Sequence, residues 1–123
     1  MKVIRFDTAD TYEPDRDWKR VSLCCEKDIS LEHFSKPPGH ASPRHDHPSA
    51  QVLVVLKGKL AITTDADGEV LLEEGDAVYI PGDEAHVVTN PLDTACVGID
   101  IFVPGRSFDF WLKRKAGDKE VGT

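Results

Sequence analysis

Apolar residues occur along this chain in short runs that end at turn-forming residues, and no segment keeps the repeat of an amphipathic helix. Runs of this kind between Gly, Pro, Asn and Asp are typical of β-strands. About nine strands are predicted in this way, at residues 3–6, 18–26, 29–35, 47–56, 59–64, 70–73, 77–80, 86–89 and 95–102. Many short strands at close spacing predict an all-β sandwich or barrel.

The segments between these runs indicate a single folding unit. Residues 36–39, 65–68 and 81–83 are rich in Pro, Gly or Asp, and none is long enough to be a linker. The 123 residues are expected to form one domain over 1–123, with a core at about 18–104, an N-terminal arm at 1–17 and a C-terminal tail at 107–123. Residues 108–112 could form one helical turn, and the segment from 113 onward is expected to be loose.

Composition and charge narrow the function classes. The net charge is −7, with 22 acidic residues against 15 Lys and Arg, so no basic face for nucleic acid is expected. No apolar run approaches the roughly 20 residues of a membrane span. Residues 1–7 lack the apolar segment of a secretory signal, and we therefore expect a cytoplasmic protein.

The three cysteines and two of the histidines are predicted to have structural roles. An odd number of cysteines without framework spacing indicates reduced thiols in a cytosol, and Cys24, Cys25 and Cys96 are expected to be small buried hydrophobes. His33 lies alone in a predicted strand, and His40 lies in a Gly-Pro loop. Either histidine could approach a pocket mouth, but both are expected to be solvated or satisfied side chains.

Four residues are candidate ligands of one metal ion. His45, His47 and Gln51 precede or enter the apolar run 52–56, and their odd numbering places them on one side of an extended strand. Neutral imidazole is the commonest metal ligand, and an amide oxygen can complete the shell. With His86, these residues are predicted to bind a divalent cation. In an alternative arrangement Gln51 is a buried amide bonded to the backbone, beside a three-histidine site.

The intervals around the candidate ligands resemble two motifs of the cupin superfamily. The matching positions are Gly39, His45, His47, Gln51 and Gly58 in the first motif, and Gly75, Pro81, His86 and Asn90 in the second. This resemblance implies a cupin jelly-roll, or double-stranded β-helix, barrel that holds Zn, Ni, Mn or Fe on the three histidines. Gln51 takes the place of the usual glutamate. A neutral ligand leaves the ion more cationic, which favours Lewis-acid chemistry on an anionic molecule.

A second cluster lies near the C-terminus. Asp100 sits in an apolar strand, where a carboxylate is costly to bury unless it is paired or used, and Phe102 shares its face. Gly98, also on this face, would leave room for a ligand to approach. Arg106 could reach Asp100 or a ligand carboxylate. An Asp100–Arg106 ion pair that fixes the strand end is the alternative.

The order of these residues after His-x-His-Pro-x-x-Gln resembles the small cupins of pectin and alginate breakdown, which convert unsaturated uronates to open-chain keto forms. The resemblance implies that Asp100, Phe102 and Arg106 are catalytic residues lining the pocket beside the metal.

The resulting hypothesis is a metal-assisted lyase, isomerase or tautomerase acting on a small acidic, sugar-derived molecule. Arg106 would hold the carboxylate, Asp100 would move a proton, and Phe102 would shape a dry wall. An Fe(II)-dependent dioxygenase and a non-catalytic small-molecule-binding protein are the alternatives. A homodimer is also expected, either by pairing of strand edges or by exchange of the segment 3–6, unless that segment packs on its own barrel.

Overall fold

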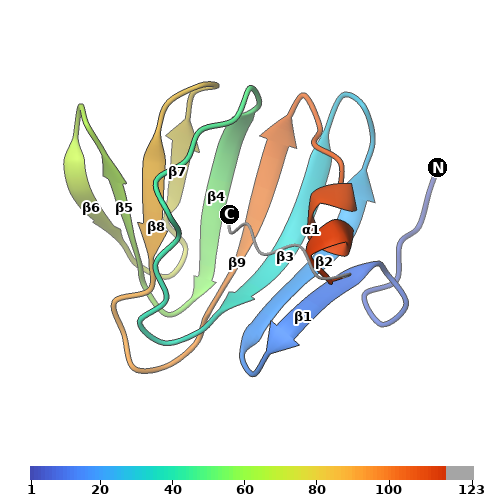
Figure 1. Ribbon diagram of the computed structural model, residues 1–123, viewed down its shortest axis with the longest axis horizontal. Coiled ribbons are helices and arrows are strands. Elements are labelled where there is room, and N and C mark those ends of the chain that lie inside the picture. Colours follow the sequence, from blue (N-terminus) through green and yellow to red (C-terminus); the bar gives the residue numbers. More distant parts are fainter. Residues whose placement is uncertain (116–123) are drawn as a thin grey trace.

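Two antiparallel sheets form the walls of the fold in the computed structural model, which describes residues 1–115 (Figure 1). The larger sheet has the order β1-β2-β3-β9-β4-β7 and the smaller one the order β6-β5-β8. The bounds are β1 Thr11–Asp15, β2 Trp18–Cys25, β3 Ser30–Lys36, β4 Ala50–Lys57, β5 Leu60–Thr64, β6 Gly68–Leu72, β7 Ala77–Ile80, β8 His86–Thr89, β9 Cys96–Val103 and α1 Asp109–Lys115. The expected all-β jelly-roll fold is confirmed. No helix in the described part of the chain is long and apolar enough to cross a membrane.

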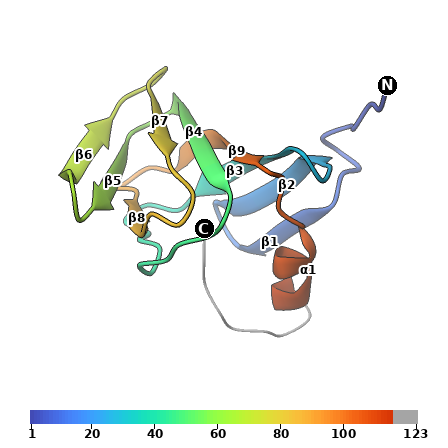
Figure 2. The ribbon, with the colours of Figure 1, turned by 90° about the horizontal axis from the view of Figure 1, so that it is seen from above.

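The hydrophobic core lies between the two sheets. Phe34, Leu53 and Val55 from the large sheet pack with Leu60 and Ile62 of β5. Figure 2 shows the small sheet folded over against the curved large sheet, with α1 at the opposite end of the molecule. Strict alternation along β3, β4 and β9 sends every second side chain inward. The inner wall of these three adjacent strands is therefore continuous.

The inner wall also carries polar and charged residues in register. β9 lies between β3 and β4, and Asp100 stands opposite Glu32 on one side and Leu53 on the other. Gln51 stands opposite Phe102. The space at Gly98 is not available to a ligand, because a Cβ there would lie 2.6 Å from the carbonyl oxygen of Val54 and closer still to the ring of Phe34. That expectation was wrong.

The N-terminal part of the chain differs from the prediction. Residues 3–6 form no strand, whereas residues 11–15 of the expected arm form β1, which pairs with β2 at the edge of the large sheet. Pro14 and the charged residues of this segment hide the strand from pattern reading, because Pro occurs in strands mainly at edges. Phe6 instead lies edge-on to His33, with 5.1 Å between ring centroids.

The C-terminal tail is more ordered than predicted. Residues 109–112 of the turn expected at 108–112 are part of α1, and the remaining tail residues 116–123 lie outside the described part of the chain. Phe108 and Trp111 pack against Tyr12 of β1. Lys113 to Lys115 occupy the last turn, where basic residues are favourable.

The three cysteines are free thiols. Cys96 is fully buried, as predicted, and burial raises its pKa to about 11. Cys25 is exposed and Cys24 is only partly buried, so the expectation of burial was wrong for this pair.

Candidate metal centre

His45, His47 and His86 converge on one point, and their ligand atoms all lie within 4.8 Å of one another. His86 is the first residue of β8, but His45 and His47 lie in the loop before β4. Strand alternation is therefore not what aligns them. The amide of His45 donates to the carbonyl oxygen of His86 at 3.1 Å, and the amide of His86 donates back at 2.9 Å. This bridge joins the loop to β8 and brings the three rings together.

The hydrogen bonds of the three rings fix their tautomer. Each Nδ1 lies 2.8 Å from a backbone carbonyl oxygen, those of Pro43, Ser49 and Glu84 respectively. A carbonyl can only accept, so each Nδ1 carries the hydrogen and each neutral ring keeps its lone pair on Nε2. This arrangement is typical of histidines that bind a metal through Nε2.

His86 shows most clearly that these lone pairs fit a cation. Its side chain is fully buried, and its Nε2 has no hydrogen-bond partner within residues 1–115. Burial lowers the pKa of His86 to about 4, and the neighbouring rings of His45 and His47 act in the same direction against the hydrogen bond to Glu84. A neutral ring with a buried, unused lone pair matches the donor that Zn, Ni, Mn or Fe takes in proteins.

Gln51 directs its side-chain oxygen toward this cluster. Its Nε2 donates to Oδ1 of Asp100 at 2.8 Å, which leaves Oε1 at 3.0 Å from Nε2 of His47. In the neutral tautomer, two lone pairs then face each other across 3.0 Å, a contact that is relieved by a metal ion against both atoms or by a proton on Nε2. The partners of the amide are side chains rather than backbone. The geometry thus fits Gln51 as a fourth ligand.

A buried network of charges lies behind Gln51. The second carboxylate oxygen of Asp100 accepts from Arg20 at 3.0 Å, and Arg20 also donates to Glu32 at 2.7 Å. Glu32 further accepts from Nε and Nη2 of Arg106, both at 2.9 Å, and from Nε1 of Trp111 at 3.1 Å. Burial alone would raise the pKa of Glu32, but Arg106 and Arg20 lower it to about 2.

The three predicted catalytic residues all lie at the inner wall, with contacts that differ from those expected. Asp100 is 1% exposed and bonds Gln51 and Arg20. Arg106 pairs with Glu32, so the alternative of an Asp100–Arg106 ion pair was wrong. The ring of Phe102 lies edge-on to His47 at 5.5 Å, and the guanidinium of Arg106 lies 3.9 Å from its centroid. Phe102 therefore separates Arg106 from the histidines.

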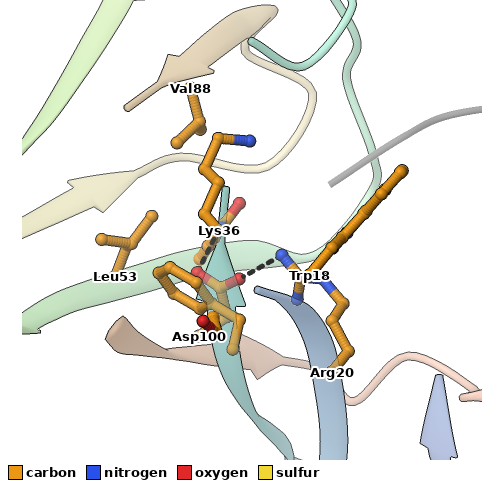
Figure 3. A pocket seen from close by; sticks show the side chains of 9 residues that line it. Trp18, Arg20, Lys36, Leu53, Val88 and Asp100 are labelled. Carbon is orange, nitrogen blue, oxygen red and sulfur yellow. Dashed lines mark hydrogen bonds and ion pairs between the residues drawn. The ribbon is translucent and has the colours of Figure 1, made fainter. Parts of the chain in front are cut away.

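Lys36 is a site residue that the sequence analysis missed. It ends β3 instead of starting a turn, and it is 4% exposed. Together with Gln51 and Asp100 it lines a cavity of about 10 Å³, which is room for about one water (Figure 3). Alternation from Ser30 to Lys36 could have revealed it, because the even positions carry Glu32 and Lys36 on the face of Phe34.

His40 is the partner of Lys36. Its Nδ1 lies 2.8 Å from Nζ of Lys36, and its ring packs against Trp18 at 4.7 Å. Burial lowers the pKa of His40 to about 4, and the charges of Lys36 and Arg20 act in the same direction. His40 is thus a satisfied side chain, as expected, but it is joined to the inner cavity instead of to solvent alone.

Comparison with known proteins supports this description. A family model described as a cupin domain matches residues 33–102. No curated protein gives a significant match. An RmlC-like cupin from Shewanella frigidimarina superposes with a TM-score of 0.76 at 22% identity, covering 89% of this chain and 96% of that one.

Two further structures give similar superpositions. For KdgF from a Halomonas species the TM-score is 0.75 at 21% identity, with coverage of 89% and 99%. For the polyketide cyclase RemF from Streptomyces resistomycificus the TM-score is 0.69 at 17% identity, with coverage of 94% and 93%. At these identities the likeness establishes the fold.

Proposed function

This chain belongs to the cupin domain family, and from that premise we propose that it is a metal-dependent lyase, isomerase or tautomerase acting on a small acidic, sugar-derived molecule. The observation that carries the proposal is the set of inward lone pairs: the buried Nε2 of His86, and the Oε1 of Gln51 facing Nε2 of His47. These donors suit a divalent cation. Such an ion, when bound, supplies Lewis-acid polarisation of a substrate oxygen.

The protein residues around the donors support work on an anion. Gln51 is neutral, so it leaves the charge of the ion uncompensated and favours a negatively charged ligand. Asp100 holds the amide of Gln51 in place, and Arg20 provides the counter-charge for its carboxylate. Asp100 is also our candidate for the group that moves a proton, because it lines the cavity beside Gln51.

Phe102 and Arg106 complete the proposed site. Phe102 is fully buried and excludes water from one side of His47. Arg106 stacks on Phe102 and forms an ion pair with Glu32. A substrate carboxylate would therefore have to approach Arg106 alongside the Arg106–Glu32 ion pair. The resemblance of these residues to those of uronate-linearising cupins makes unsaturated uronates the first substrates to test.

The test combines metal content with turnover. Protein prepared without a histidine tag is analysed for metals and then assayed for loss of the ultraviolet absorbance of the substrate's conjugated double bond. We expect Asp100→Asn to abolish turnover at unchanged metal content, and exposed Asp93→Asn to behave as wild type. Full activity of Asp100→Asn would reject its role as the proton carrier, and a folded wild type that binds no metal would reject the proposal itself.

The same sample separates the two alternative functions. Three histidines with an amide oxygen also suit Fe(II), so oxygen consumption that requires added Fe(II) and substrate would indicate a dioxygenase. Tight metal-dependent binding of a uronate that is recovered unchanged would indicate a binding protein.

A homodimer in the cytoplasm is also proposed. The exposed apolar residues Val3, Ile4 and Phe6 make the N-terminal segment a candidate contact, which light scattering of a variant lacking residues 1–6 would test.

A further inference from the structure

Lys36 is a buried amine that forms no ion pair with a carboxylate of residues 1–115. Its side chain is 4% exposed, and its hydrogen-bond partner is the imidazole of His40. Lysines are almost never fully buried unless they are paired with an opposite charge. No carboxylate within residues 1–115 forms an ion pair with Lys36 (the pairs of Asp100 and Glu32 are with arginines). The proposed function gives Lys36 no role.

Positive charge exceeds negative charge around this cavity. Arg20 and Asp100 face Lys36 from β2 and β9, and the thiol of Cys96 lies near it on β9. His40 lies on the side of Trp18, and the guanidinium of Arg114 lies 5.9 Å from the Trp18 ring. Arg114 is buried and donates to the hydroxyl of Tyr12. This local excess of cations contrasts with the net charge of −7 of the whole chain.

Lys36 also extends toward the strand that carries His86. Figure 3 shows its side chain reaching toward Val88. Val88 lies two residues after His86 on β8, and both side chains are buried on the same face of that strand. Gln51 belongs to both places, since its Oε1 faces His47 and its side chain lines the cavity of Lys36. Gln51 thus links the cavity of Lys36 to the histidine cluster.

We propose that Lys36 is the anion-binding end of this pocket and takes a carboxylate, or an equivalent oxyanion, of the ligand whose other end reaches the histidine cluster. The inference rests on the proposed function, because it takes the other end of the ligand to lie at a metal ion held by the histidine cluster. The cavity has room for about one water, so a single oxygen of the carboxylate, in place of that water, is what reaches Lys36. Arg106 pairs with Glu32 and does not line this cavity, so Lys36 is the residue that would meet an oxyanion here.

The ionisation of Lys36 gives the proposal a distinct signature. Burial lowers the pKa of Lys36 to about 7, and the charge of Arg20 acts in the same direction while Asp100 and Cys96 oppose it. A bound anion would provide the missing counter-charge and favour the ammonium form. Anion binding above pH 7 is therefore coupled to uptake of a proton, and affinity falls by up to about tenfold for each pH unit.

The experiment uses D-galacturonate as the anionic probe and D-galactose as its neutral control, with metal-loaded protein between pH 6 and pH 9. In protein with ¹³C-labelled lysine, the Lys36 signal is identified by its loss in Lys36→Met. We expect galacturonate, but not galactose, to move the titration midpoint of Lys36 upward by about one pH unit or more. Lys36→Met should bind galacturonate about 10- to 100-fold more weakly than wild type at pH 6.

Two variants keep the result interpretable. Lys36→Arg retains a fixed charge and should bind galacturonate with a weaker pH dependence, since any remaining dependence then belongs to the metal centre. Exposed Lys57→Met should bind as wild type. The inference is wrong if galacturonate leaves the titration of Lys36 unchanged, or if folded Lys36→Met binds as tightly as wild type at pH 6.

Elemental analysis of the same samples keeps the two claims apart. If Lys36→Met keeps the wild-type metal content and the wild-type affinity for galacturonate, the inference is refuted and the proposed function stands. If Lys36 responds to galacturonate in protein that is unable to bind metal, the anion-binding role of Lys36 stands and the proposed function is refuted.

Discussion

The replacement Gln51→Glu tests why a neutral residue stands among the candidate ligands. The amide of Gln51 donates to Oδ1 of Asp100 at 2.8 Å. The substitution exchanges this donor for a carboxylate oxygen, so two carboxylates meet at the same separation in a site that is almost completely buried. We therefore expect the metal-free variant to be less stable than wild type, by an amount that depends on pH.

The magnitude follows from the distance. Two unit charges 2.8 Å apart repel by about 6 kcal/mol at an effective dielectric constant of about 20. Protonating the introduced carboxyl avoids this cost and restores a donor to Asp100. From an unfolded-state pKa of about 4.3, holding that proton costs about 4 kcal/mol at pH 7 and about 1 kcal/mol at pH 5. Because the folded state holds the extra proton, stability is present at low pH and is lost as the pH rises.

Urea unfolding in EDTA, followed by tryptophan fluorescence, measures the difference. The gap between wild type and Gln51→Glu should widen by about 1.4 kcal/mol per pH unit between pH 5 and pH 7. The double variant Gln51→Glu/Asp100→Asn exchanges the amide and the carboxylate, and it should recover most of the loss. A gap that is independent of pH, or a double variant as unstable as the single one, would refute the reasoning.

Three further predictions follow from buried groups. Glu32→Gln should destabilise the protein by about 3 kcal/mol at pH 7. The stability that comes from the lowered pKa of Glu32 is present above pH 4.5 and disappears as the pH falls toward about 2, so denaturation curves should show the loss shrinking over that range. Lys36→Met should stabilise the protein by up to about 5 kcal/mol at and below pH 7, because it removes the buried ammonium. The same curves should show this gain vanishing as the pH rises from about 7 to 10.5, because the lysine then becomes neutral in the unfolded protein as well as in the folded one. Phe102→Ala should lower the free energy of unfolding by about 3–5 kcal/mol through the cavity it leaves, and a loss under 1 kcal/mol would show that the ring does not pack as described.

The fold was readable from sequence wherever strands are bounded by strong turns. β7 and β8 begin and end at the predicted residues, and β2, β3, β5 and β9 lie close to them. β1 was missed because its burial comes from α1, whose residues lie about a hundred positions later in the chain. Long-range packing of this kind leaves little trace in a local pattern of polar and apolar residues.

The site was predicted in composition better than in geometry. His45, His47 and His86 do converge, but through a bridge between a loop and β8 and not through strand alternation. The partners of Asp100 and Arg106 could not be assigned, because both choices depend on which strands adjoin β9. With β3 beside β9, Glu32 pairs with both Arg106 and Arg20, and Arg20 also pairs with Asp100.

Lys36 illustrates a further limit of sequence patterns. It stands before Pro37-Pro38-Gly39, where a turn is the natural prediction. The structure extends β3 through Lys36, and Asn90 secures the turn by donating to the carbonyl oxygens of Lys36 and Pro37, both at 3.1 Å. An amide that binds the backbone from a distant part of the chain, just after β8, cannot be recognised from local propensity.

The central claim is that His45, His47, His86 and Gln51 hold one divalent cation. Elemental analysis of protein prepared without a histidine tag, after removal of loosely bound ions, tests it most directly. We predict about one equivalent of a first-row transition metal per chain in wild type and little or none in His86→Ala. A folded wild type without metal, or a His86→Ala variant that retains a full equivalent, would contradict the claim.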